Sequence, residues 1–514
     1  MGQSDQPPPG PDLAQGVALS SVPATGVLAG HVEGEAVLLA RLDDGLHAVS
    51  GACTHYGGPL GEGLVVGDTV HCPWHHACFS LRTGQALKPP AFAALDTWRV
   101  EIEGDKVFVR EKQKAAKGTD APASDTRAHP KAIVIIGGGA AGFSAATHLR
   151  DLGFEGTLTM LSADEDPPCD RPNLSKDYLA GSAPPEWIPL KSPKYYAKRR
   201  IDLRLRCEVA SIDTAAREVV TREGERIGYD ALLIATGAEP VRLPTPGFDR
   251  DNVHALRTLA DARAIIAAVG NATSVALIGA GFIGMEAAGA LRERGLEVHV
   301  IAREEVPLER VFGRAFGNGI TQLHRDHGVH VHLKATATAF DGKSLTLDTG
   351  EQIPADLVIV GVGVKPRTQL AEAAGLQVKD GILVDALLQT SAAGIHAAGD
   401  VARYPYKGEQ VRIEHWVHAQ RMGRTAAANM LGAREAFDDV PFFWTHHHGQ
   451  DFRYTGHAER FDDERVDGEV AQRDCTTRFY REGELLAAAT VGRDLECLQI
   501  EQALRTVTTA GDTR

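Results

Sequence analysis

The chain has 514 residues, 43% of them hydrophobic, and a formal net charge of −14 at pH 7. At about 150 residues per domain, this length predicts three or four domains, each able to bury a core. The acidic balance without a Lys/Arg cluster excludes nucleic acid as a partner, and the lack of an apolar run of about eighteen residues excludes membrane insertion.

Residues 1–15 begin with MGQSDQPPPGPD, a polar and proline-rich stretch that predicts a disordered tail. Because this stretch has no apolar core for export, we expect a cytoplasmic protein. The seven cysteines are scattered along the chain. This scatter fits a reducing compartment and not a framework of disulfides.

Short alternating runs separated by turns extend from residue 16 to about residue 112. EAVLLARLDDGLHAVSG contains the hairpin signal Asp44-Gly45, and TWRVEIEGDKVFVRE contains Gly104-Asp105. Such runs are typical of strands whose successive side chains point to opposite faces. They predict a small all-β domain over residues 16–112.

Two Cys-His pairs lie in this domain, Cys53-x-His55 and Cys72-x-x-His75, with sixteen residues between them. This is the pattern of a Rieske centre, in which two thiolates bind one iron of a [2Fe–2S] cluster and two imidazoles bind the other. A structural zinc site is the alternative, because two Cys and two His also complete a tetrahedron. The adjoining runs PWH and GGPL have no role in a zinc knuckle and favour the cluster.

The two loops resemble those of high-potential Rieske proteins, but with departures. Ala77 and Phe79 replace a Ser and a Tyr that donate O–H bonds to the cluster, and Gly58 and Trp74 stand where those proteins have a disulfide. Fewer hydrogen bonds to the sulfurs predict a potential at the low end of the Rieske range, about −150 mV. His76 stands where the family usually has Gly, and we interpret it as a neighbour of the site and not a ligand.

A segment rich in Lys, Ala, Asp, Ser and Thr, residues 113–130, is predicted to be a linker. KAIVIIGGGAAGFSAATHLRDLG follows as an apolar strand, a glycine turn and a helix. Gly137, Gly139 and Gly142 have the G-x-G-x-x-G spacing, in which the first glycine turns the chain, the second lets a pyrophosphate approach and the third lets the helix pack on the strand. A bare glycine-rich turn is the alternative.

A second run, SVALIGAGFIGMEAAGALRERG, repeats this spacing at Gly279, Gly281 and Gly284. The repeat favours two dinucleotide sites over two chance glycine turns. Two further motifs complete the pattern: ALLIATGAEP, with Thr236 and Gly237, and GIHAAGDVAR, with Gly399 and Asp400.

From Lys131 to the C-terminus the chain resembles the flavoprotein reductases with two dinucleotide sites, in the ferredoxin-reductase branch. With the Rieske motif in front, the whole chain resembles the Rieske-fused apoptosis-inducing-factor-like oxidoreductases. The specific matches are CDRPNLSKDYLAG (169–181), EHWVHAQRMGRTAAANMLG (414–432) and VPFFWTHHHGQDFRYTGHA (440–458).

The resemblance implies a multidomain fold, with the small all-β Rieske domain followed by two α/β dinucleotide-binding (Rossmann-like) domains and a C-terminal α/β domain. The implied boundaries are 131–255 and 388–436 for an FAD-binding domain, 256–387 for an NAD(P)-binding domain and 437–514 for the C-terminal reductase domain.

The resemblance also implies the residues that hold FAD and the nicotinamide. Arg171 and Lys176 are expected over the flavin and its phosphates, and Trp444 near the isoalloxazine. The full expected set is Gly137, Gly139, Ala140, Ala141, Gly142, Asp164, Arg171, Lys176, Thr236, Gly237, Gly279, Gly281, Ile283, Gly284, Arg303, Gly363, Gly399, Asp400, His415, Trp416 and Trp444.

Two positions depart from the reductase pattern. The acid that bonds the adenosine ribose of FAD falls on Ala163 or Asp164, and we assign Asp164. Glu239 stands where the family has an Arg after the flavin strand, and Arg242 is the expected substitute.

The disulfide-reductase cousins carry a Cys pair beside the flavin, and this sequence has none, so dithiol chemistry is excluded. The His-rich runs at 323–332 and 446–448 have no acidic or Cys partner at ligand spacing. We therefore assign no metal site beyond the Rieske centre.

The combination of motifs predicts an NAD(P)H-dependent reductase. Electrons are expected to pass from NAD(P)H through FAD to the chain's own [2Fe–2S] cluster, and then to an external protein or small-molecule acceptor, such as an oxygenase or a cytochrome. Because the cofactors carry the chemistry, no catalytic acid or base is assigned. The alternative is a redox sensor with incidental NAD(P)H oxidation, and either a monomer or a homodimer is expected.

The nicotinamide preference depends on the end of the strand EVHVIA. NAD-specific relatives place an acid where this chain has Ala302, and Arg303 and Arg310 follow, which favours pairing with the 2′-phosphate of NADPH. Glu304 and Glu305 are the alternative, because either carboxylate could bond the ribose of NADH.

Overall fold

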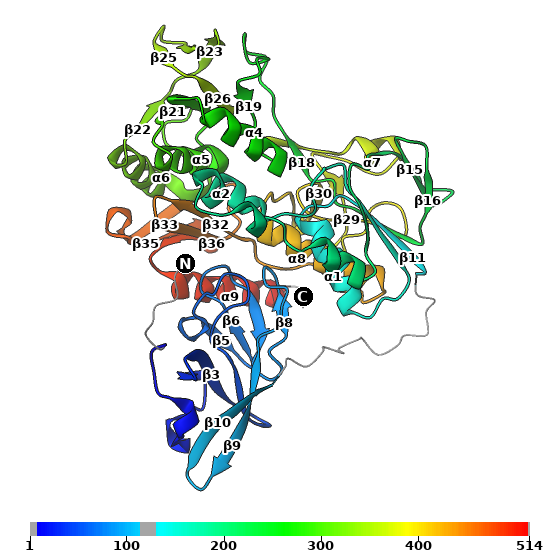
Figure 1. Ribbon diagram of the computed structural model, residues 1–514, viewed down its shortest axis with the longest axis vertical. Helices are drawn as coiled ribbons and strands as arrows, with labels where there is room; N and C mark the ends of the chain where they lie inside the picture. Colours follow the sequence, from blue (N-terminus) through cyan, green and yellow to red (C-terminus); the bar gives the residue numbers. More distant parts are fainter. Residues whose placement is uncertain (1–7, 114–129, 512–514) are drawn as a thin grey trace. The chain divides into compact units, whose positions relative to one another are not determined.

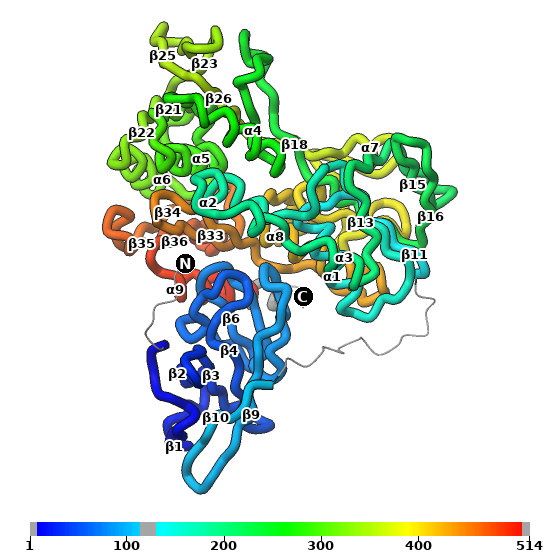
Figure 2. Tube along the Cα trace, in the orientation of Figure 1, coloured from blue at the N-terminus to red at the C-terminus, as the bar shows by residue number. Residues whose placement is uncertain are grey.

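The computed structural model describes residues 8–113 and 130–511, with side chains to Arg505. The chain forms two compact units, the first made of the N-terminal strands together with residues 493–506, and the second covering residues 130–492 (Figures 1 and 2). The predicted linker over 113–130 lies outside the described residues except at its two ends.

The first unit contains a six-stranded antiparallel sheet in the order β1-β10-β9-β4-β3-β2. Val107 and Val109 are buried while the residues between and beside them are not, because alternate side chains point to opposite faces. The strands are β1 (Val17–Ala18), β2 (Val27–Val32), β3 (Glu35–Leu42), β4 (Gly45–Ser50), β9 (Thr97–Glu103) and β10 (Lys106–Gln113).

A smaller four-stranded sheet of this unit carries the two Cys-His loops. One loop lies between β4 and β5 and contains the short helix η3 (Leu60–Glu62), and the other lies between β6 and β7. The strands are β5 (Leu64–Val66), β6 (Thr69–His71), β7 (Cys78–Ser80) and β8 (Ala86–Lys88).

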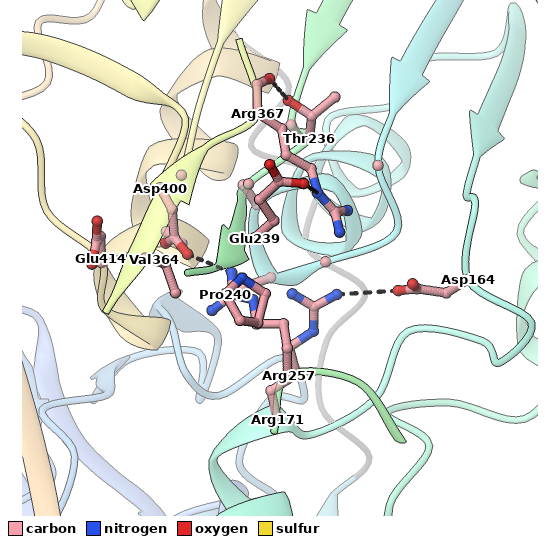
Figure 3. A pocket seen from close by; sticks show the side chains of 18 of the residues that line it. Asp164, Arg171, Thr236, Glu239, Pro240, Arg257, Val364, Arg367, Asp400 and Glu414 are labelled. Carbon is pink, nitrogen blue, oxygen red and sulfur yellow. Dashed lines mark hydrogen bonds and ion pairs between the residues drawn. The ribbon is translucent and has the colours of Figure 1, made fainter. Parts of the chain in front are cut away.

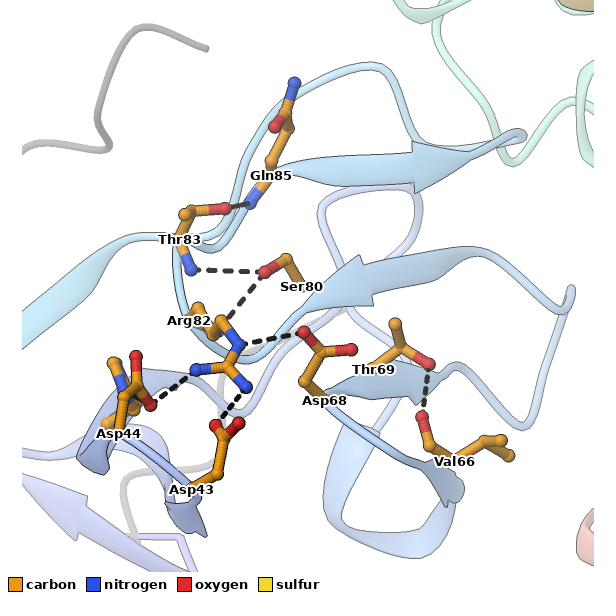
Figure 4. Close-up of polar contacts among 10 residues, drawn as sticks. Asp43, Asp44, Val66, Asp68, Thr69, Ser80, Arg82, Thr83 and Gln85 are labelled. Atoms are coloured by element: carbon orange, nitrogen blue, oxygen red, sulfur yellow. Dashed lines mark hydrogen bonds and ion pairs between the residues drawn. The ribbon is translucent and has the colours of Figure 1, made fainter. Parts of the chain in front are cut away.

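Arg82 ties the turns of this unit together. Its guanidinium pairs with Asp68 at 2.9 Å and Asp44 at 2.5 Å and also with Asp43, so it joins the β3–β4 hairpin to the β5–β6 turn (Figure 4). Three carboxylates on one guanidinium form an ion-pair network, which holds geometry better than an isolated surface pair.

The predicted disordered tail over residues 1–15 is wrong for its last residues. Leu13 lies in the short helix η1 (Leu13–Gln15), and its side chain is completely buried in the core of the first sheet. Asp12 caps this helix through a bond from the backbone N–H of Ala14. A second short helix, η2 (Leu19–Ser21), follows.

Helix α9 (Asp494–Gly511) groups with the first unit through residue 506, although the sequence predicts a single domain over 437–514. Glu501 of this helix is 4% exposed and pairs with Nδ1 of His76. The partners are 425 residues apart, and no sequence pattern indicates such a contact.

The second unit begins with a parallel sheet in the order β13-β12-β11-β17-β29, as expected for an α/β dinucleotide fold. Helix α1 (Ala140–Asp151) follows β11 and packs on α8 (Trp416–Met430), where a Cβ on Gly423 would meet the carbonyl oxygen of Ala141 at 2.1 Å. The strands are β11 (Ala132–Ile136), β12 (Thr157–Leu161), β13 (Asp202–Arg204), β17 (Ala231–Ile234) and β29 (Ile395–Ala397).

Smaller elements surround this sheet. They are η4 (Arg171–Ser175), α2 (Asp177–Ala180), η5 (Pro185–Trp187), α3 (Pro193–Lys198), β14 (Val209–Asp213), β15 (Glu218–Thr221), β16 (Arg226–Gly228), β18 (Ala238–Pro240), β27 (Val364–Pro366), α7 (Gln369–Ala373), β28 (Ile382–Leu383), β30 (Ala402–Tyr406) and β31 (Glu409–Val411).

A second parallel sheet has the order β19-β26-β20-β21-β22. One face packs on α5 and α6, and the other face packs on a three-stranded meander, β23-β24-β25. The elements are β19 (Val253–His254), α4 (Leu259–Val269), β20 (Ser274–Ile278), α5 (Phe282–Glu293), β21 (Glu297–Ala302), α6 (Glu309–Asp326), β22 (Val329–Leu333), β23 (Ala337–Phe340), β24 (Ser344–Leu347), β25 (Gln352–Pro354) and β26 (Leu357–Val360).

The last part of this unit is an antiparallel sheet in the order β32-β33-β36-β35-β34. Its elements are β32 (Phe442–His447), β33 (Gln450–Gly456), β34 (Asp463–Glu469), η6 (Val470–Gln472), β35 (Asp474–Arg481) and β36 (Glu484–Val491). The predicted fold class, an all-β domain followed by α/β dinucleotide folds, is confirmed. Among the described helices, none has the length and apolar content that crossing a membrane requires.

Candidate functional site

The first unit brings the four predicted cluster ligands onto two facing loops. Each loop closes on itself, with the N–H of Gly57 donating to the carbonyl of Cys53 at 2.8 Å and the N–H of His76 donating to the carbonyl of Cys72 at 3.1 Å. These bonds fix the backbone of both loops, so the ligand side chains start from defined positions.

The ligand atoms converge in the manner that a metal centre requires. The Nδ1 atoms of His55 and His75 lie 3.3 Å apart, close to the spacing of about 3.3 Å between two ligands bound at tetrahedral geometry. The neighbouring thiol of Cys72, followed by burial, raises the pKa of Cys53 above its usual value. Burial lowers the pKa of His55 to about 4, which keeps the imidazole in the neutral form that binds metal.

The structure explains the two unusual positions beside these ligands. His76 has a φ of +58°, a left-handed conformation that favours the Gly usual in this family, and its ring turns to Glu501. A Cβ on Gly58 would meet Sγ of Cys72 at 2.7 Å, so the first loop needs a glycine there.

The second unit contains a cavity of about 1010 Å³, at the upper end of the range for ligand pockets, about 300–1,000 Å³. Figure 3 shows part of its lining. The predicted binding residues that line it are Gly137, Gly139, Ala140, Ala141, Asp164, Arg171, Lys176, Thr236, Gly237, Gly281, Ile283, Gly363, Gly399, Asp400, His415, Trp416 and Trp444.

The first glycine turn has the shape that a pyrophosphate needs. Gly137 has a φ of +116°, and a Cβ there would lie 2.1 Å from the carbonyl oxygen of Ala235. A Cβ on Gly142 would lie 2.0 Å from the carbonyl oxygen of Gly137. At Gly139 the nearest atom would be 3.8 Å away, on Arg171. The first and third glycines therefore serve packing, and the second leaves room at the N-terminus of α1.

The second turn repeats this arrangement at the N-terminus of α5. A Cβ on Gly279 would meet the carbonyl oxygen of Gly361 at 2.5 Å, and one on Gly284 would meet the carbonyl oxygen of Gly279 at 2.2 Å. A Cβ on Gly281 would have no neighbour closer than 3.9 Å. The cavity thus has two separate glycine turns, each with open space at a helix N-terminus, which we predict to be cradles for a diphosphate.

Three of the ion pairs that line the cavity include a predicted binding residue. Asp164 accepts a bond from Arg171 at 3.1 Å, and Asp400 accepts one from Arg257 at 2.6 Å (Figure 3). The third joins Lys176 to Glu286 at 2.7 Å. These charged groups are held in place before a ligand binds, which lowers the cost of ordering them.

Several residues that line the cavity were not predicted from the sequence. Arg257, Glu286, Arg367 and Glu414 line the cavity. Arg242, the expected substitute for the arginine that Glu239 replaces, is exposed and is not part of the lining. Thr258 and Asp261, which follow Arg257, form a capping box that indicates the start of a helix. This pattern does not indicate that Arg257 lines the cavity.

Four predicted binding residues do not line the cavity. Gly142, Gly279 and Gly284 act in packing, as described above, and Arg303 is exposed at the end of β21. Glu305, one of the two carboxylates that could replace Arg303 as a ribose contact, pairs with Lys334 at 2.7 Å and with Arg314.

Aromatic side chains form one wall of the cavity. Phe443 stacks on His415 with ring centroids 3.9 Å apart, and Trp416 and Trp444 line the same space. Burial lowers the pKa of His415 to about 4, so its ring is neutral at pH 7. A flat, uncharged wall suits an aromatic ring system.

Residues 131–423 match the family model described as pyridine nucleotide-disulphide oxidoreductase, and residues 17–99 match the Rieske [2Fe-2S] domain. Apoptosis-inducing factor 3 of Homo sapiens is 31% identical over 476 residues, which cover 89% of this chain and 78% of that protein. Rhodocoxin reductase of Rhodococcus erythropolis is 38% identical over 345 residues, which cover 66% of this chain and 81% of that protein.

Among solved structures, the chain is similar to the one titled as the covalent putidaredoxin reductase–putidaredoxin complex. The match has a TM-score of 0.71 and 32% identity and covers 73% of this chain and 93% of that chain. A ferredoxin reductase from Rhodopseudomonas palustris matches with a TM-score of 0.69 and 32% identity, over 71% of this chain and 92% of that chain.

Proposed function

The chain belongs to the pyridine nucleotide-disulphide oxidoreductase family, in its Rieske-fused, apoptosis-inducing-factor-like branch, and from this we propose that it passes electrons from NAD(P)H through FAD to its own cluster and on to an external redox protein. The observation that carries the proposal is that one chain holds both a two-Cys, two-His loop pair and a cavity with two diphosphate cradles.

FAD and a [2Fe–2S] cluster are the cofactors of this oxidoreductase. FAD takes two electrons from a nicotinamide together and gives them up singly, and the cluster takes one at a time. The open face of Gly139 and the N-terminus of α1 are proposed to bind the FAD pyrophosphate. Asp164 is proposed to bond the adenosine ribose and Asp400 the ribityl chain, with Arg257 holding Asp400 in place.

The nicotinamide is proposed to use the second cradle. Gly281 and the N-terminus of α5 would bind its pyrophosphate, and Ile283 and Gly363 would border the nicotinamide side of the cavity. Lys176 and Glu286, paired at 2.7 Å, would lie beside the point where the nicotinamide delivers its electrons. Because the two charges cancel, the protein would present no net charge at that point.

A cluster on the same chain as the reductase changes how electrons leave. A tethered acceptor has an effective concentration of about millimolar, so a collision between two proteins becomes an intramolecular step. The similar putidaredoxin reductase is titled in complex with a separate protein, putidaredoxin. We infer that here the Rieske unit takes the place of that first acceptor and that a further redox protein follows it.

The proposal is tested by the spectrum of the purified protein before and after anaerobic NADPH or NADH. About two irons and two sulfides per chain are expected, with the flavin bleaching and the cluster gaining the EPR signal of a reduced Rieske centre. A chain with bound zinc in place of iron, or a cluster that stays oxidised while the flavin bleaches, would contradict the proposed route. The second result would favour a sensor.

A further inference from the structure

A line of buried polar side chains leads from the cavity to the surface of the second unit. It begins at Glu286 on α5, which lines the cavity, and passes through Thr445 and His447 on β32 and His324 on α6. The exposed fractions of these four residues are 5%, 0%, 1% and 0%. Buried polar groups of this kind are costly unless they are hydrogen-bonded, and each of these is.

The bonds form a continuous chain. The hydroxyl of Thr445 donates to Oε1 of Glu286 at 2.6 Å and lies 3.1 Å from Nε2 of His447. Nδ1 of His447 lies 3.3 Å from Nε2 of His324, and Nδ1 of His324 lies 3.2 Å from Nε2 of His448. His448 is half-buried and follows β32 at the surface.

Thr445 and the three histidines can each donate once and accept once along this line. A neutral imidazole has one N–H and one bare nitrogen, and a hydroxyl also donates and accepts. Burial is the main cause that lowers the pKa of His324 to about 3, that of His448 to about 4 and that of His447 well below its usual value, so all three rings are neutral at pH 7. The whole chain can therefore point toward Glu286, or reverse as a unit.

Oxidation of NAD(P)H by one-electron acceptors leaves a proton behind. The balance is NAD(P)H giving NAD(P)⁺, two electrons and one proton, and the proton must pass from the cavity to water. We propose that Glu286, Thr445, His447, His324 and His448 are the path by which it leaves. When the chain is reversed so that each member donates outward, one proton enters at Oε1 of Glu286, one proton moves across each bond in turn, and one leaves from His448 to water. The chain is then unchanged in proton number but points toward Glu286, and it reverses again before the next proton.

The proton path rests on the proposed reductase function, and the surroundings fit it. The other oxygen of Glu286 is held by Ser175 at 2.5 Å and Lys176 at 2.7 Å, which leaves Oε1 for the chain. At the outer end the ring of His448 stacks on that of His327 at 4.1 Å, and His327 is exposed. A proton that reaches His448 is therefore next to the solvent-exposed imidazole of His327.

The test is Thr445→Val, which keeps the shape of the side chain and removes the hydroxyl link. In a weakly buffered solution with NADPH, ferricyanide and a pH indicator, release of the proton should slow by at least about tenfold relative to wild type. Thr445→Ser should restore it. The matched control is Thr455→Val on β33, a buried threonine whose hydroxyl has no hydrogen-bond partner among the described residues.

A second measurement does not depend on turnover. In ¹⁵N-histidine-labelled protein, imidazole N–H protons held in the chain should be protected from exchange in wild type and exposed in Thr445→Val and His324→Phe. Proton release and protection that match the Thr455→Val control would overturn the path. A wild type that does not oxidise NADPH would contradict the reductase function instead, so the two failures are distinguishable.

A separate group of metal-ligating side chains lies at the edge of the second parallel sheet. Glu297 and His299 come from β21, and His330 lies opposite His299 on β22, with one ligand atom of each within 4.8 Å of the others. The sequence offered no acidic partner within the His-rich run, because Glu297 comes from the neighbouring strand. We propose that these three residues bind a divalent transition-metal ion such as Zn²⁺.

The spacing of the ligand atoms supports this site. The rings of His299 and His330 stack nearly parallel with centroids 4.7 Å apart, so one ring must rotate for both nitrogens to face the same ion. Oε1 of Glu297 lies 3.3 Å from Nε2 of His299 and 3.9 Å from Nε2 of His330, near the spacing of about 3.3 Å between tetrahedral zinc ligands. On its other side, Nδ1 of His299 lies 3.1 Å from Nε2 of His332, whose Nδ1 lies 3.8 Å from Glu351. Such outer contacts orient a ligating imidazole. The fourth position would hold water.

The test is calorimetric titration of Zn²⁺ into the intact holoprotein. Wild type should bind about one Zn²⁺ more than either Glu297→Gln or His330→Asn, because each removes one ligand from an exposed strand edge. His327→Asn, in the other histidine group, should bind as wild type does. No difference between wild type and both ligand variants, or loss of zinc only in His327→Asn, would overturn the site.

Discussion

Replacing Cys72 with Ser should abolish NADPH-driven reduction of cytochrome c while the flavin is still reduced. Cys72 is buried beside Cys53 on the second cluster loop, and a serine hydroxyl is a poor replacement for a thiolate iron ligand. Without the cluster, electrons would stop at the flavin. The rate of cytochrome c reduction should fall by at least about tenfold, whereas flavin bleaching in the first turnover should change by less than about twofold.

The matched control for this change is Cys78→Ser. Cys78 is also buried in the same sheet, but its Sγ lies 3.6 Å from Nε2 of His71 and it is not a predicted ligand. Cys78→Ser should keep the iron and the cytochrome c activity. Cytochrome c reduction that survives Cys72→Ser would show that electrons leave directly from FAD, and the Rieske unit would then need another role.

The ligand loops and the glycine turns were predictable because their chemistry is local. Two Cys-His pairs at short spacing, and glycines at G-x-G-x-x-G spacing after an apolar strand, each place their groups by backbone geometry alone. The structure adds why the first and third glycines are needed: a Cβ on Gly137 or Gly142 would lie within 2.1 Å of a carbonyl oxygen.

Contacts between distant segments were not predictable from these patterns. Glu501 of α9 reaches His76 from the far end of the chain, and Arg257 reaches Asp400 from a segment between the two dinucleotide folds. Glu501 and Arg257 belong to no motif, since a buried ion pair needs only that the fold bring two charges together. His76 was predicted to be a neighbour of the cluster site because the family usually has Gly at this position, and its φ of +58° explains that preference.

The histidine runs show the same limit in another form. The spacing of these histidines in the sequence gave no ligand set. His299 lies near Glu297 on its own strand and near His330 on the neighbouring strand. His324 on α6 contacts His447 on β32. Register between parallel strands depends on which strands pair, and that order is set by the whole sheet. Clusters made across strands therefore appear only once the topology is known.

Replacing Arg303 with Ala should lower kcat/KM for NADPH by about 10- to 100-fold, the effect of losing a charge-assisted hydrogen bond to a phosphate. Arg303 directly follows β21 and is exposed, at the strand end where this fold reads the adenosine ribose. Ala302 there carries no carboxylate to repel a 2′-phosphate. Glu305 is already paired with Lys334 and Arg314, so it would have to leave these partners to bond a ribose.

A comparison of NADPH with NADH decides whether Arg303 or a glutamate contacts the adenosine ribose. If Arg303 reads the 2′-phosphate, kcat/KM for NADH should change by less than about threefold in Arg303→Ala, since NADH has no phosphate for the guanidinium to bind. Arg310→Ala tests the second arginine, and Arg325→Ala, at the other end of α6, is the matched surface control. A wild type that prefers NADH and is indifferent to Arg303→Ala would show that Glu304, the acid next to Arg303, reads the ribose instead.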